Sequence, residues 1–231
     1  MLFDYGGTLV EEVSYDPRAG MELLLQNLTY RPRSLRVDAI VARTERVTRE
    51  VAARRDELGL ETPWPALTRL IYDYFHLHFD KPLDDLELAF WDASVVTRPM
   101  PGAAKVLREL AARAIPLGVV SNSSFRAGVI RLELAKHHLA EPISEIVASA
   151  EYAVRKPNPL LFEIGASRLD IAPSDIWFVG DRLDTDVAGA KAAGMTAAWL
   201  APPNAASDAS PDLTVTSLDE LLSLSQLSSA R

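Results

Sequence analysis

Four short motifs of this sequence carry polar side chains of types that could do chemistry together. The residues in question are Asp4 in FDYGGTL, Ser121 and Asn122 in VVSNS, Lys156 in RKP, and Asp181 and Asp186 in VGDRLDTD. Carboxylates are oxygen ligands of the kind that Mg²⁺ prefers, and a carboxylate can also act as a nucleophile. Hydrogen-bond donors and a lysine ammonium group stabilise negative charge on a phosphoryl group under attack. This combination of residue types predicts metal-assisted phosphoryl transfer.

Asp4 stands where a strand must stop. Apolar residues precede it, and Gly6, Gly7 and Thr8 follow, which is poor material for continuing a strand. Glycines lack a Cβ atom, so the chain can turn sharply there and bring backbone groups close to a bound phosphate. We therefore expect Asp4 at the tip of a buried strand. Because a strand usually has about 5–6 residues, we also expect the natural chain to begin a few residues before Met1.

The elements that position these motifs alternate between strands and helices from about residue 100 onward. The predicted strands are 115–121, 145–149, 175–181, 195–200 and 213–215, and the predicted helices are 101–114, 123–139, 159–169 and 185–194. Such alternation predicts an α/β fold, a doubly wound, Rossmann-like parallel sheet with helices on both faces. Ligands bind outside the carboxyl ends of the strands in such a sheet. Asp4, Ser121 and Asp181 each end a strand, so they should meet at one edge.

Residues 14–97 have a different pattern, with long helical periodicities and few β-branched runs. The segment 67–79 (LTRLIYDYFHLHF) is one amphipathic candidate, and the Pro-rich stretch 97–102 (TRPMPG) marks a junction. We therefore predict two domains. A core made of residues 1–13 and 98–231 carries the chemistry, and an inserted all-α cap of residues 14–97 shapes the pocket.

Composition limits the function classes. The 231 residues carry a formal net charge of −8, which argues against nucleic acid as a partner because phosphate backbones reward clustered Lys and Arg. The sequence holds no cysteine, no apolar run of the ~20 residues that a membrane span needs, and no signal peptide. We expect a soluble, cytoplasmic protein without a membrane partner, either a monomer or a homodimer.

Taken in order, the motifs FDYGGTL, VVSNS, RKP and VGDRLDTD resemble those of the haloacid dehalogenase superfamily, chiefly its Mg²⁺-dependent phosphatases with a helical C1-type cap. The last motif fits the family pattern GDxxxxD, and the resemblance covers the whole chain. It implies a hydrolase that acts on a small phosphorylated metabolite.

The resemblance implies a set of ligands for Mg²⁺. These would be the carboxylates of Asp4 and Asp181, the backbone carbonyl of Gly6, and Asp186 as support for the metal or its waters. Asp4 would also be the nucleophile, forming an aspartyl phosphate that water hydrolyses.

The resemblance also implies how the phosphoryl group is held. Ser121 would donate its hydroxyl, Asn122 a backbone N–H, and Lys156 would supply the cation. Gly7 would let the backbone approach the phosphate closely. Lys156 thus takes part in both binding and catalysis.

One position departs from the family pattern. The family's phosphatases usually carry a second Asp two residues after the nucleophile, and here that residue is Gly6. Loss of a general acid costs about 10²–10⁴-fold in rate. Three explanations stay open: slow turnover, a leaving group that needs little protonation, or an acid supplied by the cap or the substrate.

Two other functions stay open beside phosphatase activity. One is a non-catalytic protein of this fold that binds phosphate or a partner, which Gly6 favours. The other is a carbon–halogen hydrolase, which fits less well because such enzymes do not need the metal-site acids. In the cap, residues 31–55 hold eight arginines against three acids. This stretch is either a basic lid over an anionic substrate or, as i,i+4 Glu–Arg pairs favour, an ordinary solvated helix face.

Overall fold

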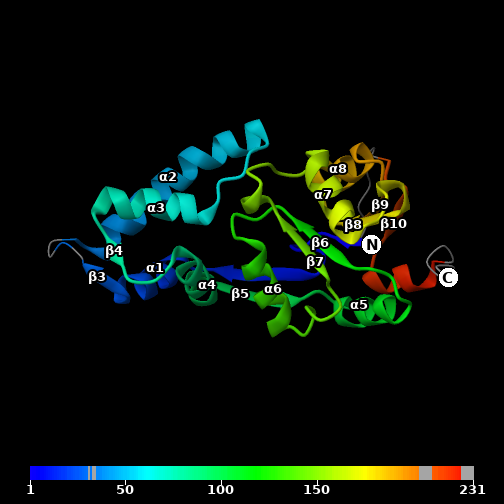
Figure 1. The fold of residues 1–231 in the computed structure, drawn as a ribbon, viewed down its shortest axis with the longest axis horizontal. Coiled ribbons are helices and arrows are strands. Elements are labelled where there is room, and N and C mark those ends of the chain that lie inside the picture. The colour runs from blue at the N-terminus through cyan, green and yellow to red at the C-terminus, as the bar shows by residue number, and fades with distance from the viewer. Residues whose placement is uncertain (31, 33–34, 203–209, 225–231) are drawn as a thin grey trace.

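The computed structural model describes residues 1–30, 32, 35–202 and 210–224, and its centre is a parallel sheet (Figure 1). The six strands lie in the order β10-β9-β8-β1-β6-β7. Their bounds are β1 (Leu2–Phe3), β6 (Gly118–Ser121), β7 (Glu145–Ala148), β8 (Trp177–Gly180), β9 (Thr196–Leu200) and β10 (Leu213–Val215). All neighbours pair in parallel, and Leu2 is opposite both Gly118 and Phe178. The short first strand is therefore central.

Helices cover both faces of the sheet, as the sequence predicts. Phe3 packs on one face with α5 (Ala103–Ala112), α6 (Ala127–Lys136) and the 3₁₀ turn Leu218–Ser223. Leu2 packs on the other face with α7 (Pro159–Leu169) and α8 (Ala188–Ala192). Successive strand side chains point to opposite faces, so two adjacent apolar residues serve two cores. The doubly wound, Rossmann-like α/β architecture is confirmed.

Residues between the sheet strands β1 and β6 form a helical segment. Its helices are α1 (Pro17–Gln26), α2 (Val37–Leu58), α3 (Trp64–Phe75) and α4 (Leu83–Ser94). They share a third apolar core that includes Leu24, Ile40, Ile71 and Phe90. An antiparallel ribbon of β2 (Val10–Tyr15) and β5 (Val95–Pro99) leads into and out of the segment. None of the helices in the described ranges is long and apolar enough to cross a lipid bilayer.

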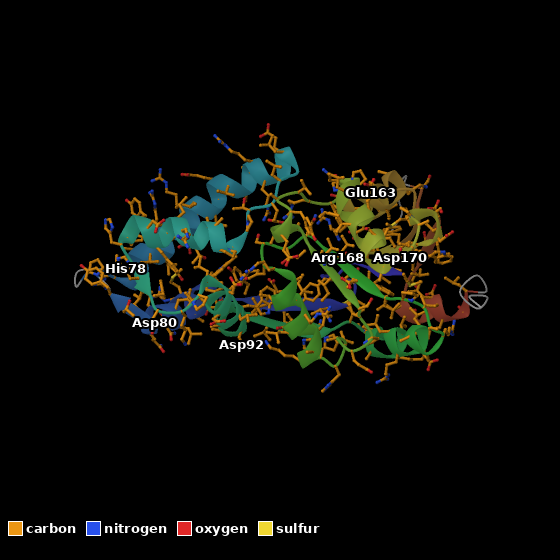
Figure 2. The ribbon with its side chains drawn as sticks, in the orientation of Figure 1. His78, Asp80, Asp92, Glu163, Arg168 and Asp170 are labelled. Carbon is orange, nitrogen blue, oxygen red and sulfur yellow. The ribbon has the colours of Figure 1, made fainter. Side chains whose placement is uncertain are left out.

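The helical segment also contains strands that the periodicity does not predict. β3 (Leu28–Tyr30) pairs with β4 (His78–Phe79) at its outer end, where His78 lies far from the sheet (Figure 2). The prediction of one helix over 67–79 is wrong at its end. α3 stops at Phe75 because His76 adopts a left-handed conformation with φ 53°.

Buried carboxylates join the helical segment to the core beside α4 and α6. Glu87 on α4 accepts hydrogen bonds from the backbone N–H of Arg126 (3.1 Å) and from its Nε (2.6 Å). In the opposite direction, Trp91 on α4 donates to Glu133 on α6 (2.8 Å). The Phe125 ring packs edge-on against Trp91 with centroids 4.8 Å apart. Polar and aromatic contacts thus fix α4 against the core.

Candidate active site

Three carboxylates converge at the carboxyl edge of the sheet. Asp4 follows β1 and continues its pairing, since its backbone N–H donates to Val179 O (2.8 Å). Asp181 follows β8, and Asp186 lies in the π-helical turn Leu183–Val187 that leads into α8. One oxygen from each of these three side chains lies within 4.8 Å of the others. The structure brings Asp4 and Asp181 together at the strand ends, as the sequence predicts, and places Asp186 beside them.

Lys156 reaches into this group from the loop before α7. Its Nζ lies 2.6 Å from Asp4 Oδ1 and 2.7 Å from Asp186 Oδ1, and it donates to Val120 O (3.0 Å). Only 4% of Lys156 is exposed. Burial alone would lower the pKa of this lysine, but the charges of Asp186 and Asp4 raise it above its usual value. Lys156 is therefore a fixed ammonium group between two carboxylates.

One ammonium group does not balance three acids. Burial raises the pKa of Asp4 to about 7. The charge of Lys156 lowers this pKa, and the charge of Asp186 raises it further. Burial and the charge of Asp186 also raise the pKa of Asp181. The ionised cluster consequently favours a further cation.

The cluster fits a divalent cation with oxygen ligands. Asp181 Oδ1 is buried and accepts no hydrogen bond from any residue that the structure describes. A buried carboxylate oxygen without a partner is costly, and a metal ion would satisfy it. The donor set of Asp4, Asp181 and Asp186 contains only hard oxygens, which suits Mg²⁺.

The two glycines after Asp4 differ in their surroundings. Gly7 has a φ of +80°, and a Cβ atom there would lie 2.6 Å from Asp181 Oδ2. Any side chain at this position would collide with the acid cluster. A Cβ atom at Gly6 would meet nothing within 4 Å. Gly6 is exposed and faces open space beside Asp4.

Ser121 and Asn122 follow β6 at the same edge. Ser121 is 3% exposed and lines the pocket beside Asp4. The Asn122 side chain accepts from Lys156 N (2.7 Å) and donates to Lys156 O (3.1 Å). These two bonds hold the loop that carries the lysine. The family resemblance implies only a backbone role for Asn122, and a side-chain contact across 34 residues has no local signal in the sequence.

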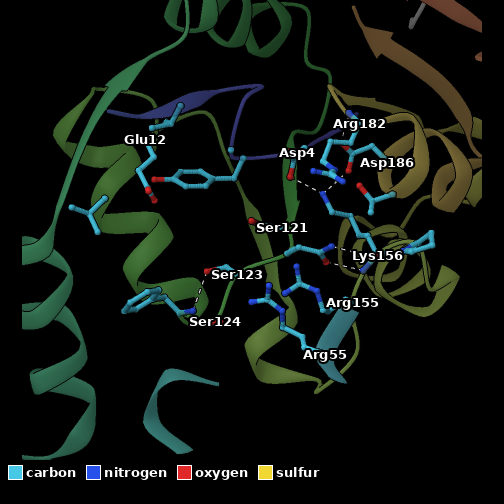
Figure 3. A pocket seen from close by; sticks show the side chains of 18 of the residues that line it. Asp4, Glu12, Arg55, Ser121, Ser123, Ser124, Arg155, Lys156, Arg182 and Asp186 are labelled. Atoms are coloured by element: carbon cyan, nitrogen blue, oxygen red, sulfur yellow. Dashed lines mark hydrogen bonds and ion pairs between the residues drawn. The ribbon is translucent and has the colours of Figure 1, made fainter. Parts of the chain in front are cut away.

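A pocket of about 870 Å³ lies over these residues (Figure 3). Its wall includes Asp4, Gly6, Ser121, Asn122, Lys156 and Asp186 from the predicted set, whereas Gly7 and Asp181 lie beside it. It also includes Glu12, Arg55 and Arg155, which the sequence does not single out. Arg155 directly precedes Lys156, so its place in the RKP motif was an available signal. Arg55 is one of eight arginines in its stretch, and nothing local distinguishes it.

Some arginines of α2 lie on a solvated helix face, and others do not. Arg46 pairs with Glu50 (3.0 Å) and Glu45 with Arg49 (3.9 Å), both on the solvent side with more than half of each side chain exposed. Arg55, three turns or less from these pairs, lines the pocket instead. The solvated face is correct for these two pairs, whereas Arg55 lines the pocket and Arg43 lies over the ring of Tyr74.

Comparisons with known proteins agree with this geometry. A family model for haloacid dehalogenase-like hydrolases matches residues 1–194. One relative is a glyceraldehyde 3-phosphate phosphatase of Methanopyrus kandleri, 36% identical over 42% of this chain and 41% of that protein. Another is a ribulose-1,5-bisphosphate 5-phosphatase of Halopiger xanaduensis, 30% identical over 68% of each chain. The matched part thus spans less than half of the first relative.

Solved structures share the fold at low identity. A HAD phosphatase from Thermococcus onnurineus has a TM-score of 0.59 and 21% identity, covering 96% of this chain and 95% of that one. A 2-haloacid dehalogenase from Pseudomonas syringae has a TM-score of 0.63 and 22% identity with the same coverage. Because the family model spans most of the sequence, the chain belongs to the haloacid dehalogenase-like hydrolases.

Proposed function

We propose that the protein hydrolyses small phosphate monoesters with the help of Mg²⁺, using Asp4 as the nucleophile. The observation that carries this proposal is the cluster of Asp4, Asp181 and Asp186, with one ammonium group between Asp4 and Asp186, at the edge of a pocket. Relatives named as phosphatases of glyceraldehyde 3-phosphate, phosphoserine and phosphoglycolate support it.

In this proposal Asp4, Asp181, Asp186 and the carbonyl of Gly6 would hold the metal. When bound, Mg²⁺ neutralises the repulsion between a carboxylate nucleophile and a phosphate dianion. Without it, the Asp4 carboxylate and the substrate would approach one another as like charges.

The reaction then has two steps on Asp4. One carboxylate oxygen forms a bond to phosphorus while the bond to the ester oxygen breaks, and the departing alkoxide takes up a proton. Water next attacks the aspartyl phosphate, which releases inorganic phosphate and restores the carboxylate. Lys156, the Ser121 hydroxyl and the Asn122 backbone N–H would stabilise the negative charge on the transferring group.

The source of the alkoxide's proton is the unusual part of this proposal. Gly6 has no side chain, so the proton must come from solvent, from the substrate or from another residue of the pocket. We therefore expect slow turnover of esters whose leaving alkoxide is strongly basic.

We also propose the division into a core of residues 1–13 and 98–231 and a cap of residues 14–97. The ribbon of β2 and β5 would be the connection, and the end of α2 would close the pocket. A covered pocket excludes water during the attack on phosphorus.

A second candidate function is phosphate binding without turnover. The observation that favours it is Gly6, since the usual general acid is missing there. The dehalogenases among the solved structures share only the fold with this chain. Carbon–halogen hydrolysis is the other alternative, and the dependence on Mg²⁺ in the test below separates it from phosphatase activity.

The test is phosphate release from a broad panel of phosphomonoesters, with Mg²⁺ or with a chelator. Asp4→Asn is the matched control, because it removes the nucleophile and keeps the shape of the side chain. We expect turnover that needs both Mg²⁺ and Asp4. Binding of phosphate esters without turnover, by folded protein, would instead favour the second candidate.

A further inference from the structure

Two arginines lie on the side of the pocket away from Asp4. Arg155 directly precedes Lys156, but the two side chains separate: Lys156 reaches Asp4, whereas Arg155 points toward Arg55 on α2 (Figure 3). Both guanidinium groups line the same pocket. The nucleophile and this pair of arginines therefore face one ligand space from two ends.

A buried carboxylate orients Arg155. Glu61 follows α2 and is 5% exposed; it accepts hydrogen bonds from Arg155 Nη1, from Ser149 Oγ (2.6 Å) and from Ser124 Oγ (3.1 Å). Only 17% of the Arg155 side chain is exposed. Fixed in this way, the guanidinium loses little conformational entropy when it binds an anion.

The same junction places Arg55. α2 ends at Gly59, which has a left-handed φ of 63°, and Gly59 O accepts from Arg155 N (3.0 Å). Two residues later, Glu61 N donates to Ala153 O (3.0 Å). The last turn of α2, which carries Arg55, is thereby attached by backbone bonds to the loop that carries Arg155 and Lys156.

The chemistry of this pair selects anions. Guanidinium groups bind carboxylates and phosphates through two parallel N–H···O bonds, and an anion between two of them gains from both. In the proposed function, Lys156, Ser121 and Asn122 already bind the transferred phosphoryl group. A pocket of about 870 Å³ also has room for a larger ligand.

We propose that the substrate carries a second anionic group, a carboxylate or another phosphate, at the far end of its leaving group, and that Arg55 and Arg155 bind it. This inference rests on the phosphatase function proposed above. It makes the two arginines specificity-determining residues, with no part in the attack on phosphorus.

The test compares esters that differ only at the far end. Phosphooxy-carboxylates and α,ω-bisphosphates with two, three or four carbons would be measured against the alkyl phosphates of equal length. At one of these lengths we expect kcat/KM to be about 10–100-fold higher for an anionic ester, as one or two charge-assisted hydrogen bonds provide. The carboxylate and bisphosphate arms identify the second group.

Substitutions then assign the preference to the arginines. Arg55→Met should lower the anionic-to-neutral ratio of kcat/KM, since one of the two guanidinium groups is lost, and Arg54→Met, on the exposed face of the same helix, should leave it intact. Arg155→Lys is preferable to alanine, which would leave Glu61 buried without its cation. It should reduce the ratio, because lysine lacks the planar fork.

Three outcomes decide the inference. Equal kcat/KM for paired esters at every length, or an unchanged ratio in Arg55→Met, would overturn it while phosphatase activity stands. Calorimetric binding of the same compounds to the Asp4→Asn protein measures the preference without turnover. If no ester is hydrolysed by the parent but that preference is found, the phosphatase proposal fails and the distal anion site remains.

Discussion

Gly6 and Gly7 are neighbours, yet the structure gives them different reasons to be glycine. At Gly7 the positive φ and the closeness of Asp181 exclude a side chain. At Gly6 neither condition holds, because the space around its Cβ direction is empty. Packing thus requires glycine at residue 7, whereas at residue 6 packing would also allow a side chain.

We predict that Gly6→Asp raises kcat on alkyl phosphates by about 10²-fold, since an acid beside Asp4 can protonate a basic alkoxide. The same substitution should change hydrolysis of p-nitrophenyl phosphate little, because that leaving group needs no proton. Initial rates over a series of leaving groups measure the difference.

Gly6→Asn is the matched control, with the same size and no acid. It should lower or leave unchanged the rate on every ester. An equal gain from Asp and Asn would show that bulk at residue 6, and not proton transfer, limits turnover.

At this scale the sequence reveals the residues that belong to contiguous motifs. Asp4 and Asp181 follow strands whose pattern is readable, so their meeting can be predicted, and Asp186 belongs to the same short motif as Asp181. The pairing of Asn122 with the backbone of Lys156 cannot, because it depends on how far two loops approach after folding. The position of Arg55 is set by where α2 ends against another loop, which composition does not encode.

Among the elements, the contact between α4 and α6 depends on charges removed from water. Burial alone would raise the pKa of Glu133, but hydrogen bonds from Lys136, Thr97 and Trp91 lower it below its usual value of 4.5. A group whose pKa is lower in the folded state stabilises the fold above its unfolded pKa. That contribution is lost as pH falls through the folded pKa.

We predict that Glu133→Gln lowers the free energy of unfolding by about 1–3 kcal/mol near pH 7, because Lys136 and Trp91 lose a charged acceptor. The gap between parent and variant should shrink as pH falls from about 4.5, the usual glutamate pKa, through the lower pKa that Glu133 has in the folded protein. Urea unfolding at several pH values measures the gap. A difference that is constant with pH would contradict a role for the charge.

Element types are predicted better than element partners. The alternation after residue 100 gives the sheet and its helices because buried parallel strands are continuous apolar runs. The ribbon of β2 and β5 is missed, because its strands lie about 80 residues apart and one of them is mostly polar. The left-handed turn at His76 is missed because only a few per cent of non-glycine residues adopt a positive φ, so histidine alone does not predict it.

For the molecule as a whole, the acid cluster favours binding of a cation but lowers the stability of the fold without one. Folding brings three carboxylates together with one ammonium group, and burial raises the pKa of both Asp4 and Asp181. Repulsion within such a site lowers the free energy of unfolding of the protein until a ligand binds.

We predict that saturating Mg²⁺ raises the melting temperature of the parent protein by several degrees, since a ligand at about 100 times its Kd adds about 2.7 kcal/mol. Asp181→Asn should melt higher than the parent in a chelator, because one repelling charge is gone, and should lose the response to Mg²⁺. Thermal scans with Mg²⁺, Ca²⁺ and a chelator measure both effects. A variant that melts lower than the parent in the chelator would contradict repulsion within the cluster.

The central position of β1 has a consequence for synthesis on the ribosome. Leu2 is made well before both of its pairing partners, Gly118 and Phe178. At about 5–20 residues per second, the second partner appears roughly 10–35 s after the first strand. During this interval an apolar strand with unpaired edges waits in the nascent chain, and chaperones that shield such segments are its natural protection. The pocket is completed only after the segment that carries Asp186 has been made.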